Sequence, residues 1–323
     1  MKSLTSFIYL FLILFSISFG QQRALRLVIL PDTQSYLESC PEIMKSQFSW
    51  LSAQASTIDY VLHVGDITQS NTPAEWALAA EYFDLINGQI PYAFSLGNHD
   101  FGSGPDKYAD IRGSQLANKY FPLSSLEKNS SIKGVFEAGK IDNTFHEFEF
   151  DGQKWLILAL EFGPRKKVLE WANQVVEDHP DHKVVLLTHA YMYVGNKRQS
   201  EGDNWRAQAY GIGKDTGDDA VNDGEEIWQN LVKKNQNFLL TFSGHVLLEG
   251  YGRLVSEGIK GNHVYQFLSN YQRGVTGFGN GCNGYLRIVD IDLKNKNLQV
   301  KTYSPWFDDW LKDEHNEFSY TLK

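Results

Sequence analysis

Five short runs of apolar residues each end a few positions before a side chain that can bind a metal ion. The runs cover residues 24–30, 60–64, 92–96, 184–187 and 238–242. Their β-branched residues favour strands. The polar residues that follow are Asp32, Asp66, the triplet Asn98-His99-Asp100, His189 and His245. Because the carboxyl ends of parallel strands share one edge of an open α/β sheet, we expect these side chains to meet in one crevice.

Helical periodicity lies between the first strands. Residues 41–58 and 73–87 carry apolar side chains at a spacing close to 3.6, and Pro73 suits a first helical turn. Two more helices are expected over 164–177 and 225–234. The alternation of strands and helices predicts right-handed βαβ units on a parallel sheet.

The remaining predicted strands do not alternate with helices. Segments 144–150 and 154–160 flank Asp151-Gly152, which predicts a hairpin. The C-terminal segments 263–268, 285–292 and 298–303 are expected to pair antiparallel. The aromatic residues Trp306, Phe307, Trp310 and Phe318 are expected to cover a sheet or core edge. Long loops at 101–134, 191–224 and 270–284 follow strand ends, where functional loops gather.

The first residues have the composition of a secretory signal. Lys2 precedes an apolar segment at 7–15, and the small residues Ser18 and Gly20 suit a cleavage site. We therefore expect a signal peptide over 1–20 and one main domain over 21–323, secreted or periplasmic and without a membrane span. The alternative is an uncleaved anchor, for which the segment is shorter than the ~20 residues that a span requires.

The net charge limits the classes of binding partner to expect, and the cysteine content bears on the redox environment. The formal net charge is −9 and no long basic block is present, so the main attraction for nucleic acid or an anionic membrane is missing. An anionic substrate would need a local positive site, which a metal centre supplies. The two cysteines, Cys40 and Cys282, fall in loop-like sequence. In an oxidising compartment they are either a disulfide or two free thiols, and the sequence leaves both open.

Oxygen and imidazole ligands on separate strand ends suit divalent metals, and an Asp can bridge two ions. The order of the residues resembles the calcineurin-like metallophosphoesterase superfamily over nearly all of the chain after the signal. The blocks that carry the resemblance are Asp32-Thr33-Gln34, Gly65-Asp66, Gly97-Asn98-His99-Asp100, Thr188-His189 and Gly244-His245. It implies a four-layer αββα sandwich with two mixed β-sheets, an α/β fold.

The resemblance also implies a ligand set. Asp66 would bridge two metals, and Asn98, His189 and His245 would complete one site. The other site would use Asp32, but Gln34 stands where the family has a first-block His and Leu247 where it has the last His. We expect one or two divalent ions. The amide oxygen of Gln34 can still act as a ligand, so Mn²⁺ or Mg²⁺ suits this oxygen-rich site. Mn²⁺, Zn²⁺ or Fe²⁺ suits the His-containing site. Glu249 is a candidate replacement ligand.

The implied activity is hydrolysis of a phosphate monoester or diester by a metal-activated hydroxide. His99 would be the general acid, with Asp100 holding its ring. The substrate is then a small or extended phosphate ester. Two rivals remain: a catalytically inactive metal-binding or scaffold protein on the same fold, and a metal-dependent hydrolase of another bond such as a carboxylic ester. The oligomeric state is left open.

Other polar residues are weighed as structural or functional. Alternation along its strand turns His63 away from Asp66, so it is expected to be a core histidine. Several loop residues are either substrate contacts or packing residues, because they follow strand ends or lie in crevice loops. They are Tyr36, Tyr191, Arg198, Arg206 and Arg273.

Overall fold

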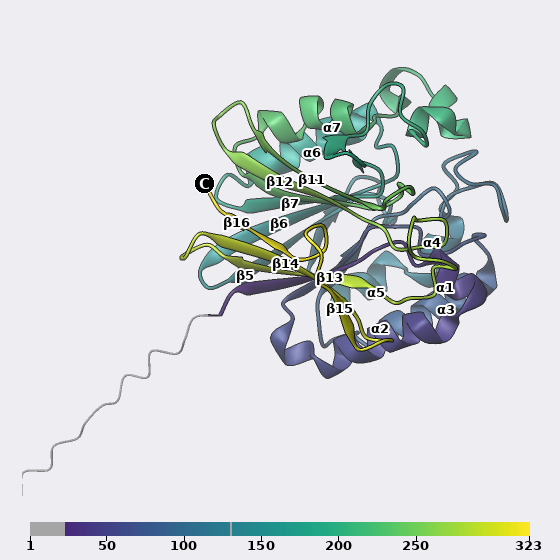
Figure 1. Cartoon of the computed structure of the whole chain (residues 1–323). Helices are drawn as coiled ribbons and strands as arrows, with labels where there is room; N and C mark the ends of the chain where they lie inside the picture. Colours follow the sequence, from purple (N-terminus) through teal and green to yellow (C-terminus); the bar gives the residue numbers. More distant parts are fainter. Residues whose placement is uncertain (1–22, 130) are drawn as a thin grey trace, which may run out of the picture.

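A computed structural model describes residues 23–129 and 131–323. The predicted signal peptide lies outside these residues. Two seven-stranded sheets pack face to face with helices on both outer faces (Figure 1). The expected αββα sandwich of two mixed sheets is confirmed. Within the described part of the chain, no helix combines the length and apolar character that crossing a membrane requires.

The first sheet contains the first three predicted strands. Its order is β15 (Asp309–Leu311), β14 (Asn297–Ser304), β13 (Leu286–Asp292), β1 (Leu25–Leu30), β2 (Tyr60–His63) and β3 (Tyr92–Phe94), and β16 (Phe318–Thr321) also pairs with β14. Strands β1, β2 and β3 are parallel, whereas β13 runs antiparallel to β1. The outer face carries α1 (Gln34–Ser39), α2 (Pro41–Ala53) and α3 (Pro73–Asp84) (Figure 1).

The second sheet has the order β11 (Tyr251–Glu257), β12 (His263–Ser269), β10 (Phe238–Ser243), β7 (Lys183–Thr188), β6 (Gln153–Leu160), β5 (Thr144–Phe150) and β4 (Ile132–Val135). The predicted hairpin is β5 with β6. Strands β6, β7, β10 and β12 are mutually parallel. The antiparallel prediction is thus correct for β13 with β14 and for β12 with β11, but β12 also pairs parallel with β10, so its carboxyl end joins the parallel edge.

Helices α6 (Lys166–Asp178) and α7 (Gly224–Asn230) cover the second sheet, and α4 (Gln115–Tyr120) and α5 (Leu123–Asn129) lie in the expected long loop. A short hairpin, β8 (Met192–Tyr193) with β9 (Lys197–Arg198), lies in the 191–224 loop. The predicted helix 41–58 ends early, at Ala53, before a 3₁₀ turn at Ala55–Thr57. Helix α3 begins with a capping box between Thr72 and Glu75, which satisfies the first free N–H groups.

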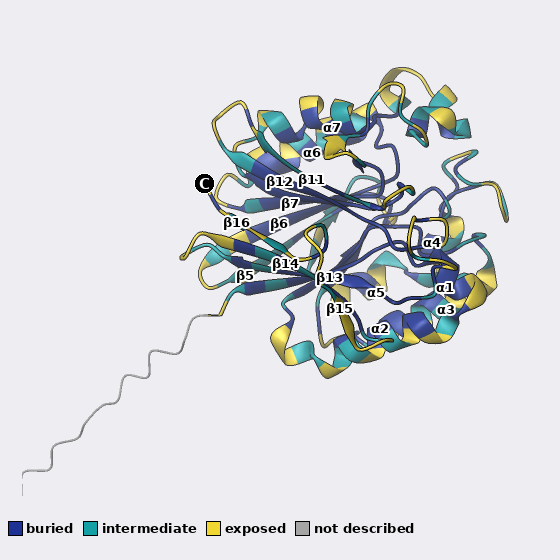
Figure 2. Ribbon diagram, in the orientation of Figure 1, coloured by how far each residue is buried: buried dark blue, intermediate teal, exposed yellow. Residues whose placement is uncertain are grey.

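Both faces of the central strands are buried (Figure 2). Along β1, Val28 and Leu30 pack with the helices of the first sheet, whereas Leu27 and Ile29 pack between the sheets. This double burial explains why the strands read as continuous apolar runs. Three separate apolar cores therefore hold the strand ends in place.

The C-terminal aromatic residues form part of the expected cover. Phe318 packs against Phe267 with ring centroids 5.8 Å apart. Trp310, in the edge strand β15, packs against Tyr303 of the first core with ring centroids 4.7 Å apart. Trp306 and Phe307 are 45% and 54% exposed.

Cys40 and Cys282 form a disulfide, with Cα atoms 6.1 Å apart and a sequence separation of 242. The bond connects the start of α2 to the 270–284 loop. Of the two states that the sequence left open, the paired one is observed.

The disulfide should stabilise the folded chain through the long loop that it closes. We expect the Cys40→Ser/Cys282→Ser double variant to lose about 2–5 kcal/mol of unfolding free energy, because the unfolded chain gains conformational freedom. Denaturant unfolding measures the loss. Adding reductant should reproduce it in the wild-type chain and leave the double variant unchanged; equal stability of wild type with and without reductant would contradict the prediction.

Candidate metal centre

The carboxyl ends of six parallel strands form the site. Asp32 follows β1, Asp66 follows β2, Asn98 follows β3, His189 follows β7 and His245 follows β10. The sixth is β12, which is followed by Asn270. The predicted residues are all buried and lie together, as the contacts below show.

Three of these side chains present one atom each to a common point. The Nε2 atom of His189 lies 3.2 Å from Oδ2 of Asp66 and 3.1 Å from Nδ1 of His245. These three residues form a group that could hold a metal ion. Octahedral ligands about 2.1 Å from an ion lie about 3.0 Å from one another, so the spacing suits one cation.

Hydrogen bonds behind the imidazoles decide which nitrogen faces the group. Nδ1–H of His189 donates to the Val64 carbonyl at 3.0 Å, and Nε2–H of His245 donates to the Trp205 carbonyl at 2.6 Å. In a neutral ring the opposite nitrogen then carries a lone pair. Two lone pairs and a carboxylate oxygen therefore converge, an arrangement that requires a cation between them. Backbone partners of this kind orient metal-binding histidines.

The charge states agree with this arrangement. Burial lowers the pKa of His245 to about 3, so its ring is neutral. Burial also opposes the charged form of His189, but the Asp66 carboxylate outweighs it and raises the His189 pKa to about 9. A proton thus occupies the place between Asp66 and His189 when no metal does. The three side chains therefore fit a cation, because either a metal ion or a proton supplies positive charge between them.

Asn98 offers a candidate fourth ligand atom. Its Oδ1 is buried and has no hydrogen-bond partner in the protein. A buried acceptor left without a donor is costly, and a bound cation would satisfy it. Asn98 lines the same cavity as Asp66 and His245. Asp66, Asn98, His189 and His245 are therefore suited to hold one divalent ion.

The backbone around this group is strained. Asp66, Trp205 and His245 have φ values of 51°, 60° and 72°, in the left-handed region that non-glycine residues rarely adopt. Each such residue costs about 1–2 kcal/mol. Gly97 and Gly244 are required for a different reason, because a Cβ at either position would overlap the carboxylate of Asp66 or Asp32. Strain of this kind is typical of functional sites.

The second metal site expected from the sequence is occupied by hydrogen bonds within the protein. The Asp32 carboxylate accepts hydrogen bonds from the His245 backbone N–H at 3.0 Å, from Nδ2 of Asn270 at 3.0 Å and from Nε2 of Gln272 at 2.8 Å. Nε2 of Gln34 donates to Oδ2 of Asp66 at 3.0 Å. Amide hydrogens thus surround both carboxylates on this side.

These residues do not fit a second cation as they stand. The Asp32 carboxylate already accepts hydrogen bonds from three donors. Leu247, which also lines the cavity, has an alkyl side chain that cannot bind a cation. Oε1 of Gln34 is buried without a partner, but Nε2 of this amide, and not the oxygen, faces Asp66. The candidate ligand Glu249 is exposed and does not line the cavity. The expected use of Asp32 and Gln34 as ligands therefore differs from their observed hydrogen bonding.

His99 lies at the mouth of the group. Its backbone N–H donates to Oδ1 of Asp66 at 3.0 Å, and its ring Nδ1 lies 2.7 Å from the Gln69 carbonyl, to which Nδ1–H donates. The Tyr108 ring lies alongside, with centroids 4.2 Å apart. His99 is only partly buried and lines the cavity with Tyr108.

Asp100 does not hold the ring of His99, contrary to the expectation. Its carboxylate accepts hydrogen bonds from the backbone N–H groups of Ile67, Thr68 and Gly97 and from the Thr68 hydroxyl. The Gln69 carbonyl orients the His99 ring instead. Asp100 is therefore a positioning residue that ties the loop after β2 to the loop after β3.

The other candidates have structural partners. His63 is fully buried and bonds to Thr33, as expected of a core histidine. The five candidate substrate contacts all have partners away from the cavity: Tyr36 with Asn283, Tyr191 with Gln266, Arg198 with Glu225, Arg206 with Asp223, and Arg273 with Glu38. None of them lines the cavity above the metal group.

Sequence reasoning missed several contributors, among them Tyr108 and the Gln69 carbonyl. Asn270 and Gln272 follow β12, and the strand-end rule would have found them had that strand been predicted as parallel. Trp205 acts through its backbone carbonyl, which no residue type can signal. Tyr210 lines the cavity from the same loop, without any motif around it.

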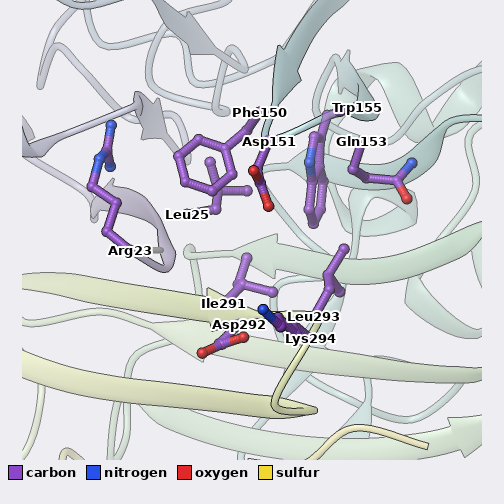
Figure 3. Close-up of a pocket in the computed structure, with 11 residues that line it drawn as sticks. Arg23, Leu25, Phe150, Asp151, Gln153, Trp155, Ile291, Asp292, Leu293 and Lys294 are labelled. Atoms are coloured by element: carbon purple, nitrogen blue, oxygen red, sulfur yellow. The ribbon is translucent and has the colours of Figure 1, made fainter. Parts of the chain in front are cut away.

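A second hollow of about 360 Å³ lies at the opposite end of the strands. Figure 3 shows Phe150 and Trp155 facing Ile291 and Leu293 across it. Its lining comes from the start of β1, the β5–β6 turn and the end of β13, and it contains no histidine. The metal group and this hollow are therefore separate.

Comparisons with known proteins agree with the fold. The curated protein YvnB of Bacillus subtilis (strain 168), described as uncharacterized, is 28% identical over 290 residues, which cover 87% of this chain. The chain spans about one fifth (20%) of the length of that relative.

Among solved structures, the first of the two named below has the same fold. Purple acid phosphatase PPD1 from yellow lupin (Lupinus luteus) is similar, with a TM-score of 0.53, 13% identity, and coverage of 94% of this chain and 54% of that one. The NAD nucleotidase NadN of Haemophilus influenzae matches with a TM-score of 0.47 and 15% identity, over 92% of this chain and 50% of that one. The sequence profile described as calcineurin-like phosphoesterase matches residues 25–249. The chain belongs to the calcineurin-like phosphoesterase family.

Proposed function

We propose that this chain is a metal-dependent phosphoester hydrolase that works with one divalent cation. The observation that carries the proposal is the convergence of Oδ2 of Asp66, Nε2 of His189 and Nδ1 of His245 beside the unpartnered Oδ1 of Asn98. A cation held there would polarise a phosphoryl oxygen and lower the pKa of an attacking water. Mn²⁺, Zn²⁺ or Fe²⁺ suits this mixture of imidazole and oxygen ligands.

The protein's own residues supply the rest. The Gln69 carbonyl fixes the His99 ring through Nδ1–H, so Nε2 is the ring atom that remains to protonate a leaving oxygen. The backbone N–H of His99 bonds to Asp66, which ties the position of the acid to that of the ligand group. Gln34, Asn270 and Gln272 place amide hydrogens where a second cation would otherwise offset the charge of Asp32 and Asp66.

We also propose export, with residues 1–20 as a signal peptide. The disulfide between Cys40 and Cys282 supports an oxidising compartment. Mass spectrometry of the protein recovered outside the cytoplasm should find Gln21 as the first residue.

Hydrolysis of aryl phosphate reporters with added Mn²⁺, Zn²⁺, Fe²⁺ or Mg²⁺ tests the activity. Turnover of a phosphate ester with at least one of these ions supports the proposal. A folded, metal-loaded protein without any turnover would favour the inactive scaffold, and cleavage of acyl esters alone would favour a carboxylic ester hydrolase.

His245→Ala should weaken metal binding. Losing an outer hydrogen bond of a metal ligand costs ~10–100-fold in affinity, and we expect the loss of this ligand to cost at least as much. Elemental analysis after equilibrium dialysis measures the bound metal. His263→Ala is the matched control, because His263 lies at the start of β12 and outside the group. Equal metal content in the two folded variants would contradict the ligand assignment.

His99→Gln should lower kcat by about 10²–10⁴-fold for an ester with an alkyl leaving group, because the leaving oxygen then lacks a proton donor. The loss should be smaller for a 4-nitrophenyl leaving group, which needs less protonation. Metal content should stay unchanged. Equal losses for both leaving groups would show that His99 does not act as the acid.

A further inference from the structure

The cavity above the metal group has a volume of about 220 Å³. Asp66, Asn98 and His245 of the ligand group line it together with His99. Its walls are Tyr108, Trp205, Tyr210 and Leu247, and the amides of Gln34 and Gln272 complete the lining. Aromatic, alkyl and neutral amide groups thus surround the place where a phosphoryl group would lie.

Lysine and arginine are absent from the residues that line this cavity. Arginines of nearby loops are held by carboxylates: Arg206 by Asp223 at 2.7 Å and Arg112 by Glu161 at 3.2 Å. Arg273 in the 270–284 loop pairs with Glu38. Arginine forks are the usual protein partners of phosphate oxygens. Here the positive charge for a substrate must come almost entirely from the cation.

The charge of the centre is therefore small. One divalent cation carries two positive charges, and the Asp66 carboxylate beside it removes one. At most one net positive charge remains for the substrate. A phosphomonoester near neutral or alkaline pH carries two negative charges. Among the other lining residues only His99 can carry a positive charge, and in the proposed function its proton goes to the leaving oxygen rather than to the oxygens beside the cation. A phosphodiester carries one and matches the centre.

The residues along the walls of the cavity also favour a phosphodiester. A diester has an organic group on each side of phosphorus. The Tyr108 ring beside His99 can pack against the leaving group, and Trp205, Tyr210 and Leu247 can pack against the group that stays. Resting on the proposed function above, we propose that the substrate is a singly charged phosphodiester with apolar or planar ester groups, and that doubly charged monoesters are poorly bound.

Two pairs of probes test the proposal on the metal-loaded protein. Turnover is compared for bis(4-nitrophenyl) phosphate and 4-nitrophenyl phosphate. Binding is compared by calorimetry at alkaline pH for diphenylphosphinate, with one negative charge, and phenylphosphonate, with two; neither has an ester bond to cleave. We expect the singly charged member of each pair to be preferred by about tenfold or more, a difference of about 1.4 kcal/mol in binding.

A pair of variants tests the cause. Leu247→Lys adds one positive charge to the wall, and Leu247→Met keeps the wall apolar at similar size. Lysine should shift the binding ratio toward phenylphosphonate by about tenfold, whereas methionine should leave the ratio unchanged. Circular dichroism and metal content confirm that both variants fold and load.

The outcomes separate the two proposals. Tighter binding of phenylphosphonate by the wild-type protein would overturn the charge argument, even if phosphate esters are cleaved. An unshifted ratio in a folded Leu247→Lys variant would also overturn it. Failure to cleave either ester would overturn the hydrolase proposal, while the binding ratio would still decide which charge the cavity accepts.

Discussion

Two imidazole nitrogens and a carboxylate oxygen, all of which can act as acceptors, lie within a few ångströms of one another. This is stable only with positive charge in the middle, and the rest of the site follows from it. Backbone carbonyls of Val64 and Trp205 hold the rings from behind, so the lone pairs cannot turn away. The left-handed backbone at Asp66 and His245 brings the side chains into range. Strain at those residues is tolerated because a buried strand precedes each turn.

The fold contributes a single edge on which the six parallel strands that carry the site residues end. Three come from one sheet and three from the other, and the core between the sheets holds the two rows together. The disulfide adds a further connection, because the 270–284 loop that it ties to α2 also contains Gln272. Residues far apart in the sequence can therefore be placed with the precision that a metal centre demands.

Much of this could be predicted from the sequence, because apolar runs that end on ligand-type residues report both a strand and its functional end. The convergence of Asp66, Asn98, His189 and His245 followed from that rule alone. Asn270 was missed because the strand before it was predicted to pair antiparallel, and the pairing direction of a short apolar strand depends on its neighbours. The role of Asp100 was misjudged for a related reason: which donors a buried carboxylate meets is decided by loop geometry, and here they are backbone N–H groups.

The central claim is that this centre holds one cation, with amide hydrogen bonds in place of a second. The most direct measurement is an anomalous difference map from a crystal soaked in Mn²⁺, recorded at the manganese absorption edge. The account predicts one peak between Asp66, Asn98, His189 and His245, with Gln272 still bonded to Asp32. A second peak between Asp32 and Asp66, or no peak beside His189 and His245, would contradict it.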